Sequence, residues 1–357
     1  MVSSIPVEGL VDESAKHHGE RGPDINFMSD LKVARHFYDE HRTGPVMVDL
    51  HPTLACQNQC YFCISANEHI TGIAHDNFSR AKKLEWTVLK RTIMDLIDMD
   101  VKSIQLTGGG EPTTYPEFQQ LLKELIPLKV GLFTNGILAG EYAKEIVEAC
   151  DWVRISLDAV GSEMYKTIKG VDHYHEVVDS IVKLVEARGN EKTPRIGVSY
   201  ILTPESVPGM RQVVMELEHS GIDYIQFKDV IMRGMKFTSR YERNIRKAVE
   251  SVSGLGLKVL YTAHGSYDDG ATPKDIPQCN ATDYVAVIGA DGEVYGCCHL
   301  EYQPQASYGS IYKEPFQQIW QNRPFVQVSE ALCWQCRFKK ANEVIESLKK
   351  IEDGDFL

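Results

Sequence analysis

Residues 46–63, VMVDLHPTLACQNQCYFC, place three cysteines shortly after an apolar run. Cys56, Cys60 and Cys63 follow one another at spacings of four and three residues. Soft thiolates select iron–sulfur clusters or zinc, and a closed zinc site normally takes four ligands. Three thiolates can hold three irons of a cubane cluster and leave the fourth iron open to a substrate. The stretch therefore predicts a strand that carries a reactive iron–sulfur site at its end.

The same cysteines also fit two simpler interpretations. They can form part of a zinc site in which His51 or His69 is the fourth ligand. They can also be unrelated buried thiols. The spacing alone does not separate these alternatives, so other parts of the chain must be considered.

The Cys-x3-Cys-x2-Cys spacing resembles the signature of the radical S-adenosylmethionine (SAM) superfamily, and Phe62 matches the aromatic residue that usually precedes the third cysteine. The resemblance implies that a [4Fe-4S] cluster binds the amino and carboxylate groups of SAM through its open iron. It also implies reductive cleavage of SAM to a 5′-deoxyadenosyl radical, which takes a hydrogen atom from a substrate. A reducing partner such as a flavodoxin or ferredoxin would supply the electron.

A glycine-rich stretch, TGGGEPT at residues 107–113, follows the second predicted strand. Consecutive glycines let the backbone approach a ligand closely, and a carboxylate or backbone carbonyl can accept from an ammonium group. Loops that bind phosphate look similar, but this chain lacks the Lys-Ser/Thr of a P-loop. By resemblance, Gly109, Gly110 and Glu111 match the superfamily's GGE motif, which binds the amino group of SAM.

Polar residues also end the third and fourth predicted strands, in FTNG and ISLDA. By a looser resemblance, Thr134, Asn135, Ser156 and Asp158 are expected to reach the ribose and the sulfonium or carboxylate end of SAM. The alternative is helix capping by Asn135 or Asp158. Lys169 occupies a position where relatives often carry arginine, and it either contacts the SAM carboxylate or is solvated.

Short apolar runs alternate with segments of helical period through the middle of the chain. This order predicts an α/β fold with parallel strands and right-handed crossovers. The predicted strands are Val46–Leu50, Ser103–Thr107, Gly131–Thr134, Trp152–Leu157, Ile196–Leu202 and Tyr224–Asp229. The predicted helices include Glu85–Met99, Glu117–Leu125, Gly140–Cys150, His173–Ala187 and Pro208–His219. The family resemblance implies a partial (β/α)6 TIM-like barrel, in which ligands gather at the carboxyl ends of the strands.

The sequence is divided into three parts. Residues 1–45 are a polar leader with a predicted helix at Leu31–His41, and residues 46–262 form the predicted barrel. Residues 263–357 form a smaller α+β domain that is rich in cysteine and ends in a charged helix, Lys339–Ile351.

The C-terminal part has a second cysteine set. Cys279, Gly292 and Cys297 read as C-x12-G-x4-C, and Cys333 and Cys336 follow as C-x2-C. The Asp-Gly turn that includes Gly292 predicts a hairpin that brings the first two cysteines together. This set resembles the twitch domain, a shortened SPASM domain, and implies a second, auxiliary [4Fe-4S] cluster with four protein ligands. A four-cysteine structural zinc site is the alternative.

Two further cysteines are not assigned as ligands of either cluster. Cys150 ends an apolar helix face and is most simply a core thiol. Cys298 neighbours Cys297 and is either idle, a replacement ligand, or a hydrogen donor to a substrate radical.

Composition limits the classes of function. A net charge of −12 argues against nucleic-acid binding, which depends on basic surface. No apolar stretch approaches the ~20 residues of a membrane span, and the N-terminus does not resemble a signal peptide. Nine cysteines without an export signal favour metal ligands over disulfides and predict a cytoplasmic protein.

The two predicted clusters suggest a reaction. A fully ligated auxiliary cluster has no open iron, so besides supporting the fold it can accept or relay an electron. The first hypothesis is therefore a net two-electron oxidation (dehydrogenation) of a small molecule. The second is maturation of a ribosomally made peptide by crosslinking or epimerisation, and the third is a non-catalytic iron–sulfur or zinc protein.

The residues do not identify a general base. Four residues with suitable groups are expected at the carboxyl ends of the strands, and the sequence does not rank them. They are Tyr200, Lys228, Asp229 and Arg233.

Overall fold

The computed structural model describes residues 43–66, 79–230, 239–252, 255–262, 278–326 and 338–352. The predicted helix Leu31–His41 lies outside these ranges, so it stays a prediction.

One ten-stranded sheet organises the molecule, with the strand order β10-β9-β8-β1-β2-β3-β4-β5-β6-β7. Strands β1 to β7 are parallel, and β8 pairs with the free side of β1, also in parallel. The strands are β1 (Met47–Leu50), β2 (Ser103–Leu106), β3 (Lys129–Thr134), β4 (Trp152–Ser156), β5 (Arg195–Leu202), β6 (Tyr224–Asp229), β7 (Val259–Thr262), β8 (Val285–Ile288), β9 (Glu293–Tyr295) and β10 (Gly309–Ser310).

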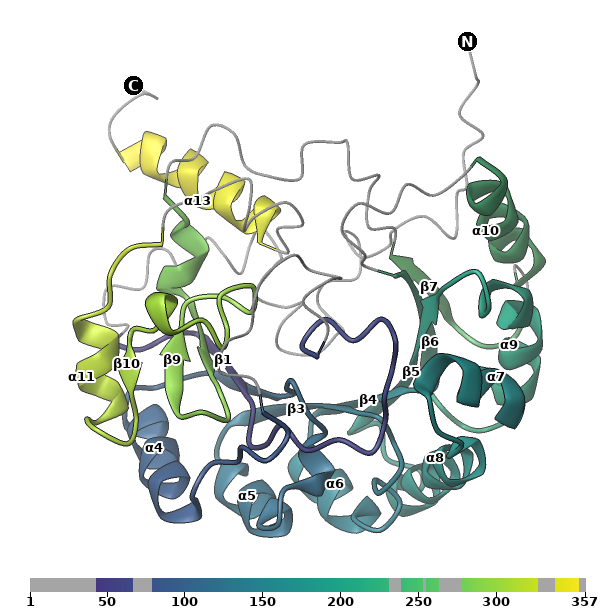
Figure 1. The fold of residues 1–357 in the computed structure, drawn as a ribbon, viewed down its shortest axis with the longest axis horizontal. Helices are drawn as coiled ribbons and strands as arrows, with labels where there is room; N and C mark the ends of the chain where they lie inside the picture. Colours follow the sequence, from purple (N-terminus) through teal and green to yellow (C-terminus); the bar gives the residue numbers. More distant parts are fainter. Residues whose placement is uncertain are drawn as a thin grey trace.

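Helices cover the outer side of the curved sheet, and Figure 1 shows them following its curvature from α4 to α10. They are α4 (Trp86–Asp98), α5 (Phe118–Leu125), α6 (Ala143–Ala149), α7 (Gly161–Lys169), α8 (Tyr174–Arg188), α9 (Met210–Leu217), α10 (Ser239–Val252), α11 (Phe316–Gln321) and α13 (Lys339–Glu352). Four short 3-10 helices complete the described elements: η1 (Pro112–Thr114), η2 (Val207–Gly209), η3 (Asn280–Asp283) and η4 (Pro304–Ala306).

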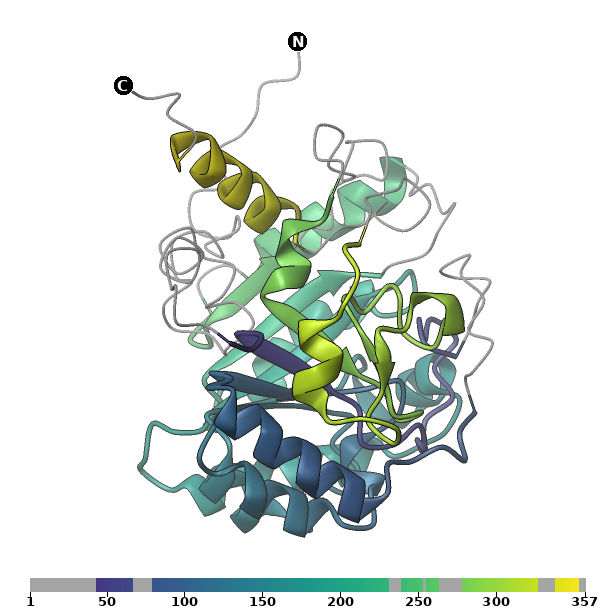
Figure 2. The same cartoon turned by 90° about the vertical axis from the view of Figure 1, so that its left-hand side faces the viewer.

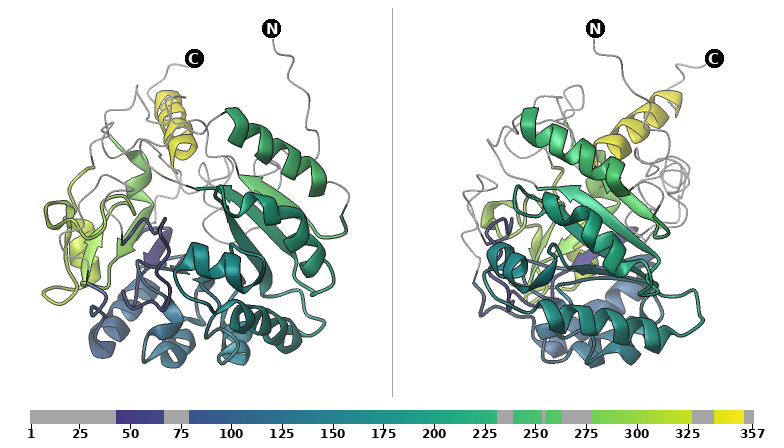
Figure 3. Two further views of the ribbon diagram at one scale, coloured as in Figure 1. Left: turned by 45° about the vertical axis from the view of Figure 1, so that its right-hand side comes forward. Right: turned by 90° about the vertical axis from the view of Figure 1, so that its right-hand side faces the viewer.

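The predicted α/β fold is confirmed. All six predicted strands are present with ends within two residues of the predicted ones, and β7 extends the parallel series beyond them. The two outermost strands, β7 and β10, are not paired with each other, so the barrel is open. Figure 3 shows α9 and α10 over the β6–β7 edge.

Alternation along the strands separates an outer, apolar face from an inner face with polar groups. In β1, Val48 and Leu50 belong to the core that packs against the helices, so Asp49 between them faces the interior of the barrel. Gln105 of β2 is paired in register with Asp49, and both are buried. The interior of the barrel therefore presents polar groups beside β1.

The C-terminal segment is built onto this sheet. The predicted hairpin is present: β8 and β9 pair in antiparallel fashion, and Gly292 N donates to Gly289 O at 2.9 Å in the turn. The predicted C-terminal helix is α13, which lies next to η3, ahead of β8 (Figure 2). Although β7 ends at the predicted boundary of the barrel, residue 262, the sheet continues into the following segment through β8.

Within the described residues, no helix is both long and apolar enough to cross a membrane.

Candidate active site

The three N-terminal cysteines lie in the loop that follows β1, at the carboxyl end of the parallel strands, where TIM-like barrels bind their ligands. All three are partly buried, and a turn in which Cys63 N donates to Cys60 O at 3.1 Å brings the last two together. Burial raises the pKa of the Cys60 thiol to about 11, although nearby Lys169 opposes this shift.

The glycine-rich loop is docked against the residue that precedes the first cysteine. Ala55 O accepts from Glu111 N at 2.7 Å and from Thr114 Oγ1 at 3.2 Å. A Cβ atom at Gly110 would lie 2.5 Å from Ala55 O and 2.5 Å from the carbonyl carbon of Leu54. Only glycine therefore permits this contact between the two loops.

The Glu111 carboxylate is buried and accepts four hydrogen bonds from the protein. Thr113 donates from its backbone N (3.1 Å) and its Oγ1 (2.8 Å), Thr134 Oγ1 donates at 2.7 Å, and Asn135 N donates at 2.5 Å. Burial raises the pKa of the Glu111 carboxyl, and these hydrogen bonds partly offset that effect. In this arrangement Glu111 joins the ends of β2 and β3, and the role in SAM binding predicted for this loop stays a prediction.

Asn135 connects this network to the first cysteine. Its Nδ2 lies 3.0 Å from Gln57 Oε1 and 3.8 Å from Cys56 Sγ, and its Oδ1 accepts from Ile137 N at 2.9 Å. The predicted helix capping by Asn135 is wrong, because the next helix, α6, begins at Ala143 with Tyr142 at its N-cap, and Asn135 Oδ1 instead closes a turn in the loop after β3. Contact of Asn135 with SAM stays a prediction.

The C-terminal end of α7 supports the centre of the cysteine loop. Lys169 O accepts from Gln59 N at 2.7 Å, and Lys169 Nζ lies 5.7 Å from the centre of the Phe62 ring. Lys169 is buried rather than solvated, and its Nζ forms an ion pair with Asp158. Burial lowers the pKa of Lys169, but the charges of Asp158, Cys60 and Tyr165 and the hydrogen bond to Asp158 together outweigh burial, and the net shift is upward.

Ser156 is the last residue of β4, and Asp158 lies two residues beyond it in the loop. Asp158 Oδ1 accepts from Ile201 N at 2.6 Å, so this carboxylate joins the ends of β4 and β5 as well as holding Lys169. Ser156 is partly buried and paired in register with Ser199. Contact of either predicted residue with SAM stays a prediction.

A buried polar cluster connects β1 to the C-terminal segment. His51 Nδ1 lies 2.8 Å from Tyr302 Oη and 3.8 Å from Glu301 Oε2, and Ser65 Oγ donates to Glu301 Oε1 at 3.4 Å. Tyr302 has a φ of 59°, a conformation that non-glycine residues rarely adopt. From the sequence, His51 is expected only as a zinc ligand, and no pattern in the sequence indicates a role for Glu301 or Tyr302.

Replacing Tyr302 by phenylalanine is expected to lower the free energy of unfolding by about 1–3 kcal/mol, because His51 Nδ1 loses a buried partner. Urea denaturation of the apoprotein measures the loss. Tyr312→Phe is the control, since Tyr312 is exposed and accepts its hydrogen bond from Glu85 N at the surface. Equal losses in the two variants would contradict a stabilising function of the buried cluster.

The auxiliary cysteines are only partly described. Cys279 is buried, Asn342 Nδ2 lies 3.4 Å from its Sγ, and Cys297 packs against the same apolar cluster. Cys298 contacts the Cys297 thiol, whose pKa is raised first by this hydrogen bond and then by burial. The structure thus brings Cys279 and Cys297 together as predicted.

The remaining members of this set, Cys333 and Cys336, lie outside the described residues, so the complete set of ligands stays a prediction.

The N-terminal cysteines suit a cluster better than a single ion. Within the described residues, no three His, Cys, Asp or Glu side chains lie close enough together to hold one metal ion. The charges of Cys63 and Cys56 act on the Cys60 thiol, so the three thiols lie near one another, and soft thiolates are the ligands that an iron–sulfur cluster takes. His51 is engaged with Tyr302 and Glu301.

The other expectations have mixed outcomes. Tyr200 was wrongly placed at the ligand-binding end, because it is buried in the core facing the helices and donates to Ser206 O at 2.9 Å. Lys228 is partly buried beside Phe133, and Asp229 accepts from Tyr261 Oη at 3.0 Å. Arg233 and His69 lie outside the described residues.

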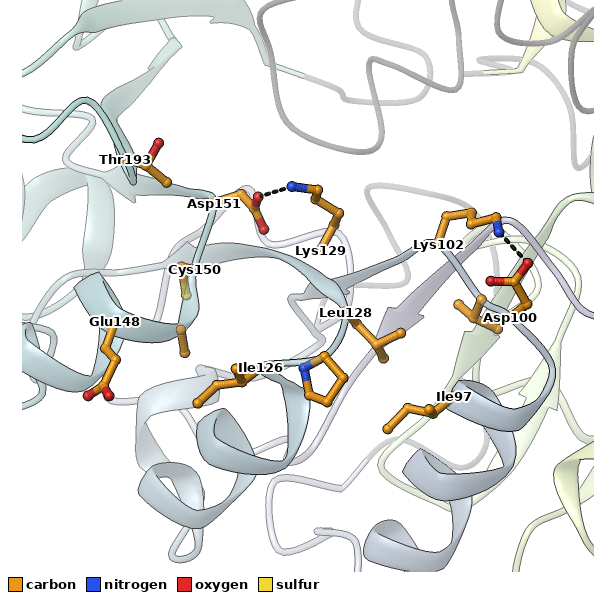
Figure 4. Close-up of a pocket in the computed structure, with 13 residues that line it drawn as sticks. Ile97, Asp100, Lys102, Ile126, Leu128, Lys129, Glu148, Cys150, Asp151 and Thr193 are labelled. Atoms are coloured by element: carbon orange, nitrogen blue, oxygen red, sulfur yellow. Dashed lines mark hydrogen bonds and ion pairs between the residues drawn. The ribbon is translucent and has the colours of Figure 1, made fainter.

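A cavity of about 520 Å³ lies at the opposite ends of the strands (Figure 4). Its walls include Lys102 and Lys129, at the starts of β2 and β3, and Cys150, which is a buried core thiol as predicted. Because the cysteine loop follows the carboxyl end of β1, this cavity is separate from the candidate active site.

Comparison with known proteins finds two matching families, in separate parts of the chain. Residues 50–214 match the model of the radical SAM superfamily, and residues 279–338 match SPASM, an iron–sulfur cluster-binding domain. A probable GTP 3′,8-cyclase from Sulfurisphaera tokodaii is 26% identical over 218 residues, which are 59% of this chain and 65% of the relative. The match thus spans slightly less than two thirds of that relative.

Two solved structures show a similar fold. SuiB from Streptococcus suis, bound to SAM, superposes with a TM-score of 0.59 at 14% identity, over 78% of this chain and 66% of SuiB. The SAM-bound anSMEcpe superposes with a TM-score of 0.57 at 17% identity, over 87% of this chain and 93% of the other. The cysteine loop, the fold and the two domain matches agree. The chain belongs to the radical SAM superfamily and has a C-terminal SPASM domain that binds an auxiliary iron–sulfur cluster.

Proposed function

We propose that this enzyme removes two electrons and two hydrogens from a polar substrate held between its two cluster sites. When bound, the first cluster and SAM supply the radical that abstracts hydrogen, and the auxiliary cluster accepts the second electron. The protein must then bind the substrate between the sites and accept a proton.

The placement of the two cysteine sets along β1 supports this proposal most strongly. Cys56 follows the carboxyl end of β1, whereas Cys279 packs in a cluster with Val46 and Met47 at its amino end. The two sites therefore lie toward opposite ends of β1. A substrate in the interior of the barrel can lie between them.

The inner face of β1 and β2 suits a polar substrate. Asp49 and Gln105 are neighbours on this face and are buried. Within the described residues, Gln105 Oε1 is a buried oxygen without a hydrogen-bond partner. Because such an oxygen is costly to leave unsatisfied, a bound donor such as a hydroxyl, amine or amide group of the substrate would stabilise it.

The chemical nature of the substrate is open to a direct test. The curated relative is a probable GTP 3′,8-cyclase, and SuiB and anSMEcpe have been solved with peptides or with SAM. We propose a small polar molecule first, because the buried Gln105 oxygen suits a single polar donor, and a peptide second. The auxiliary site would serve an oxidation of either substrate.

The test uses anaerobically reconstituted full-length protein with dithionite, SAM and a panel of polyols, amino sugars, short peptides and GTP. The expected product has lost two hydrogens, with one 5′-deoxyadenosine formed per product. A product of unchanged mass would contradict the proposed oxidation.

Removing one ligand of the auxiliary cluster separates SAM cleavage from the later oxidation of the substrate. We expect about eight irons per chain in the wild type and about four in Cys297→Ala. This variant should still cleave SAM but lose most of the oxidised product. Cys298→Ala is the matched control, and retention of eight irons there would assign the ligand to Cys297. Full product formation by Cys297→Ala would contradict electron transfer to the auxiliary cluster.

A further inference from the structure

The side-chain amide of Asn135 has one orientation that satisfies its neighbours. Ile137 N is a donor, so the amide atom that faces it at 2.9 Å must be the oxygen, Oδ1. Nδ2 therefore points to the other side, where Gln57 Oε1 lies at 3.0 Å and Cys56 Sγ at 3.8 Å. Two acceptors share this donor group, and one of them is the first cysteine of the cluster loop.

The backbone under this amide is fixed by the buried Glu111 network. Asn135 N donates to Glu111 Oε2, and Thr134, the preceding residue, donates to Oε1. Asn135 itself is only 7% exposed. The Glu111 network thus fixes the backbone of Asn135, and turning the amide away from Cys56 would break its hydrogen bonds with Ile137 N and Gln57 Oε1.

A donor at this position has an electrostatic effect on the cluster. A reduced cluster carries one more negative charge than an oxidised one, and part of it resides on the thiolate sulfurs. An N–H group directed at such a sulfur stabilises the reduced form more than the oxidised form.

We propose that Asn135 donates a hydrogen bond to the Cys56 thiolate and thereby raises the reduction potential of the SAM-binding cluster. Glu111 acts through Asn135 and is a positioning residue. The first cluster must be reduced before SAM can be cleaved, so this contact sets how strong an electron donor the enzyme requires. The inference concerns the cluster alone and holds for any substrate.

The test is a potentiometric titration of reconstituted full-length protein followed by electron paramagnetic resonance. Addition of SAM identifies the signal of the SAM-binding cluster, because only that signal changes. Asn135→Ala and Asn135→Asp should both shift its potential to more negative values and leave the auxiliary signal in place. The Asp variant retains the acceptor for Ile137 N and the Ala variant adds no charge, so agreement between them isolates the lost N–H donor.

Gln57→Ala is the matched control, because it removes the competing acceptor and keeps the Asn135 donor. Its potential should equal that of the wild type or be less negative. With dithionite, Asn135→Ala should form 5′-deoxyadenosine more slowly than the wild type. This difference should become smaller when titanium(III) citrate, a stronger reductant, replaces dithionite.

Two outcomes would overturn the proposal. One is an unchanged potential in both Asn135 variants with SAM-sensitive clusters intact. The other is failure of both variants to hold a cluster that Gln57→Ala holds, since Asn135 would then retain the cluster rather than set its potential.

Discussion

Gly110→Ala is expected to lower SAM-dependent formation of 5′-deoxyadenosine by about 10²-fold, the usual effect of displacing a reactive group by ~1 Å. The new methyl group would lie 2.5 Å from Ala55 O, so the glycine-rich loop and the cysteine loop must separate. Ala55 directly precedes Cys56, and the separation therefore moves the first thiolate. Product analysis of the reconstituted enzyme with dithionite measures the rate, and iron analysis measures cluster content.

The matched control for this substitution is Gly256→Ala. The three atoms nearest to its Cβ would belong to the Glu218 side chain, whose Oε1, at 2.6 Å, accepts from Gly256 N and is a flexible end that can shift at the surface. We expect this variant to match the wild type in iron content and rate. Wild-type behaviour of Gly110→Ala in both measurements would contradict the close contact between the two loops.

The second large effect concerns stability. Lys169→Met is expected to lower the free energy of unfolding by about 3–5 kcal/mol, because it leaves the buried Asp158 carboxylate without its cation. The loss is measured by urea denaturation of the apoprotein. Lys166→Met on the same helix is the control, because Lys166 is exposed and its substitution should change stability by less than ~0.5 kcal/mol.

A double-mutant cycle separates the ion pair from the rest of α7. In Asp158→Asn the side-chain carbonyl can still accept from Ile201 N, so this variant removes mainly the charge. The double variant Asp158→Asn/Lys169→Met should be more stable than the sum of the two single losses predicts. Additive losses would show that the two charges do not stabilise each other.

The parts of the fold that have a strong local pattern were predictable. Strands such as Val46–Leu50 and Ile196–Leu202 are continuous apolar runs, and parallel pairing follows from the helices between them. The strand β7 was missed because VLYT is short and follows the glycine-containing segment SGLGLK. The pairing of β8 with β1 was also missed, since no local pattern specifies contact across such a long stretch of chain.

In the candidate site, too, only the residues that belong to compact local motifs were predictable from the sequence. Spacing identified Cys56, Cys60 and Cys63 and the glycine-rich loop, because these motifs are compact in the sequence. The ion pair of Lys169 with Asp158 and the contact of His51 with Tyr302 depend on loops meeting in space. For Glu111, the sequence predicted an acceptor but could not show that four protein donors already occupy it.

The pairing of β8 with β1 has a consequence for the order of events during synthesis. One edge of β1 stays uncovered until most of the chain has left the ribosome, because its partner strand is among the last to be made. Contacts between residues so distant in sequence form late, after the local helices and hairpins. The first cysteine loop is therefore made early on an incomplete sheet, and insertion of its cluster before release would take place without the wall that the C-terminal domain later provides.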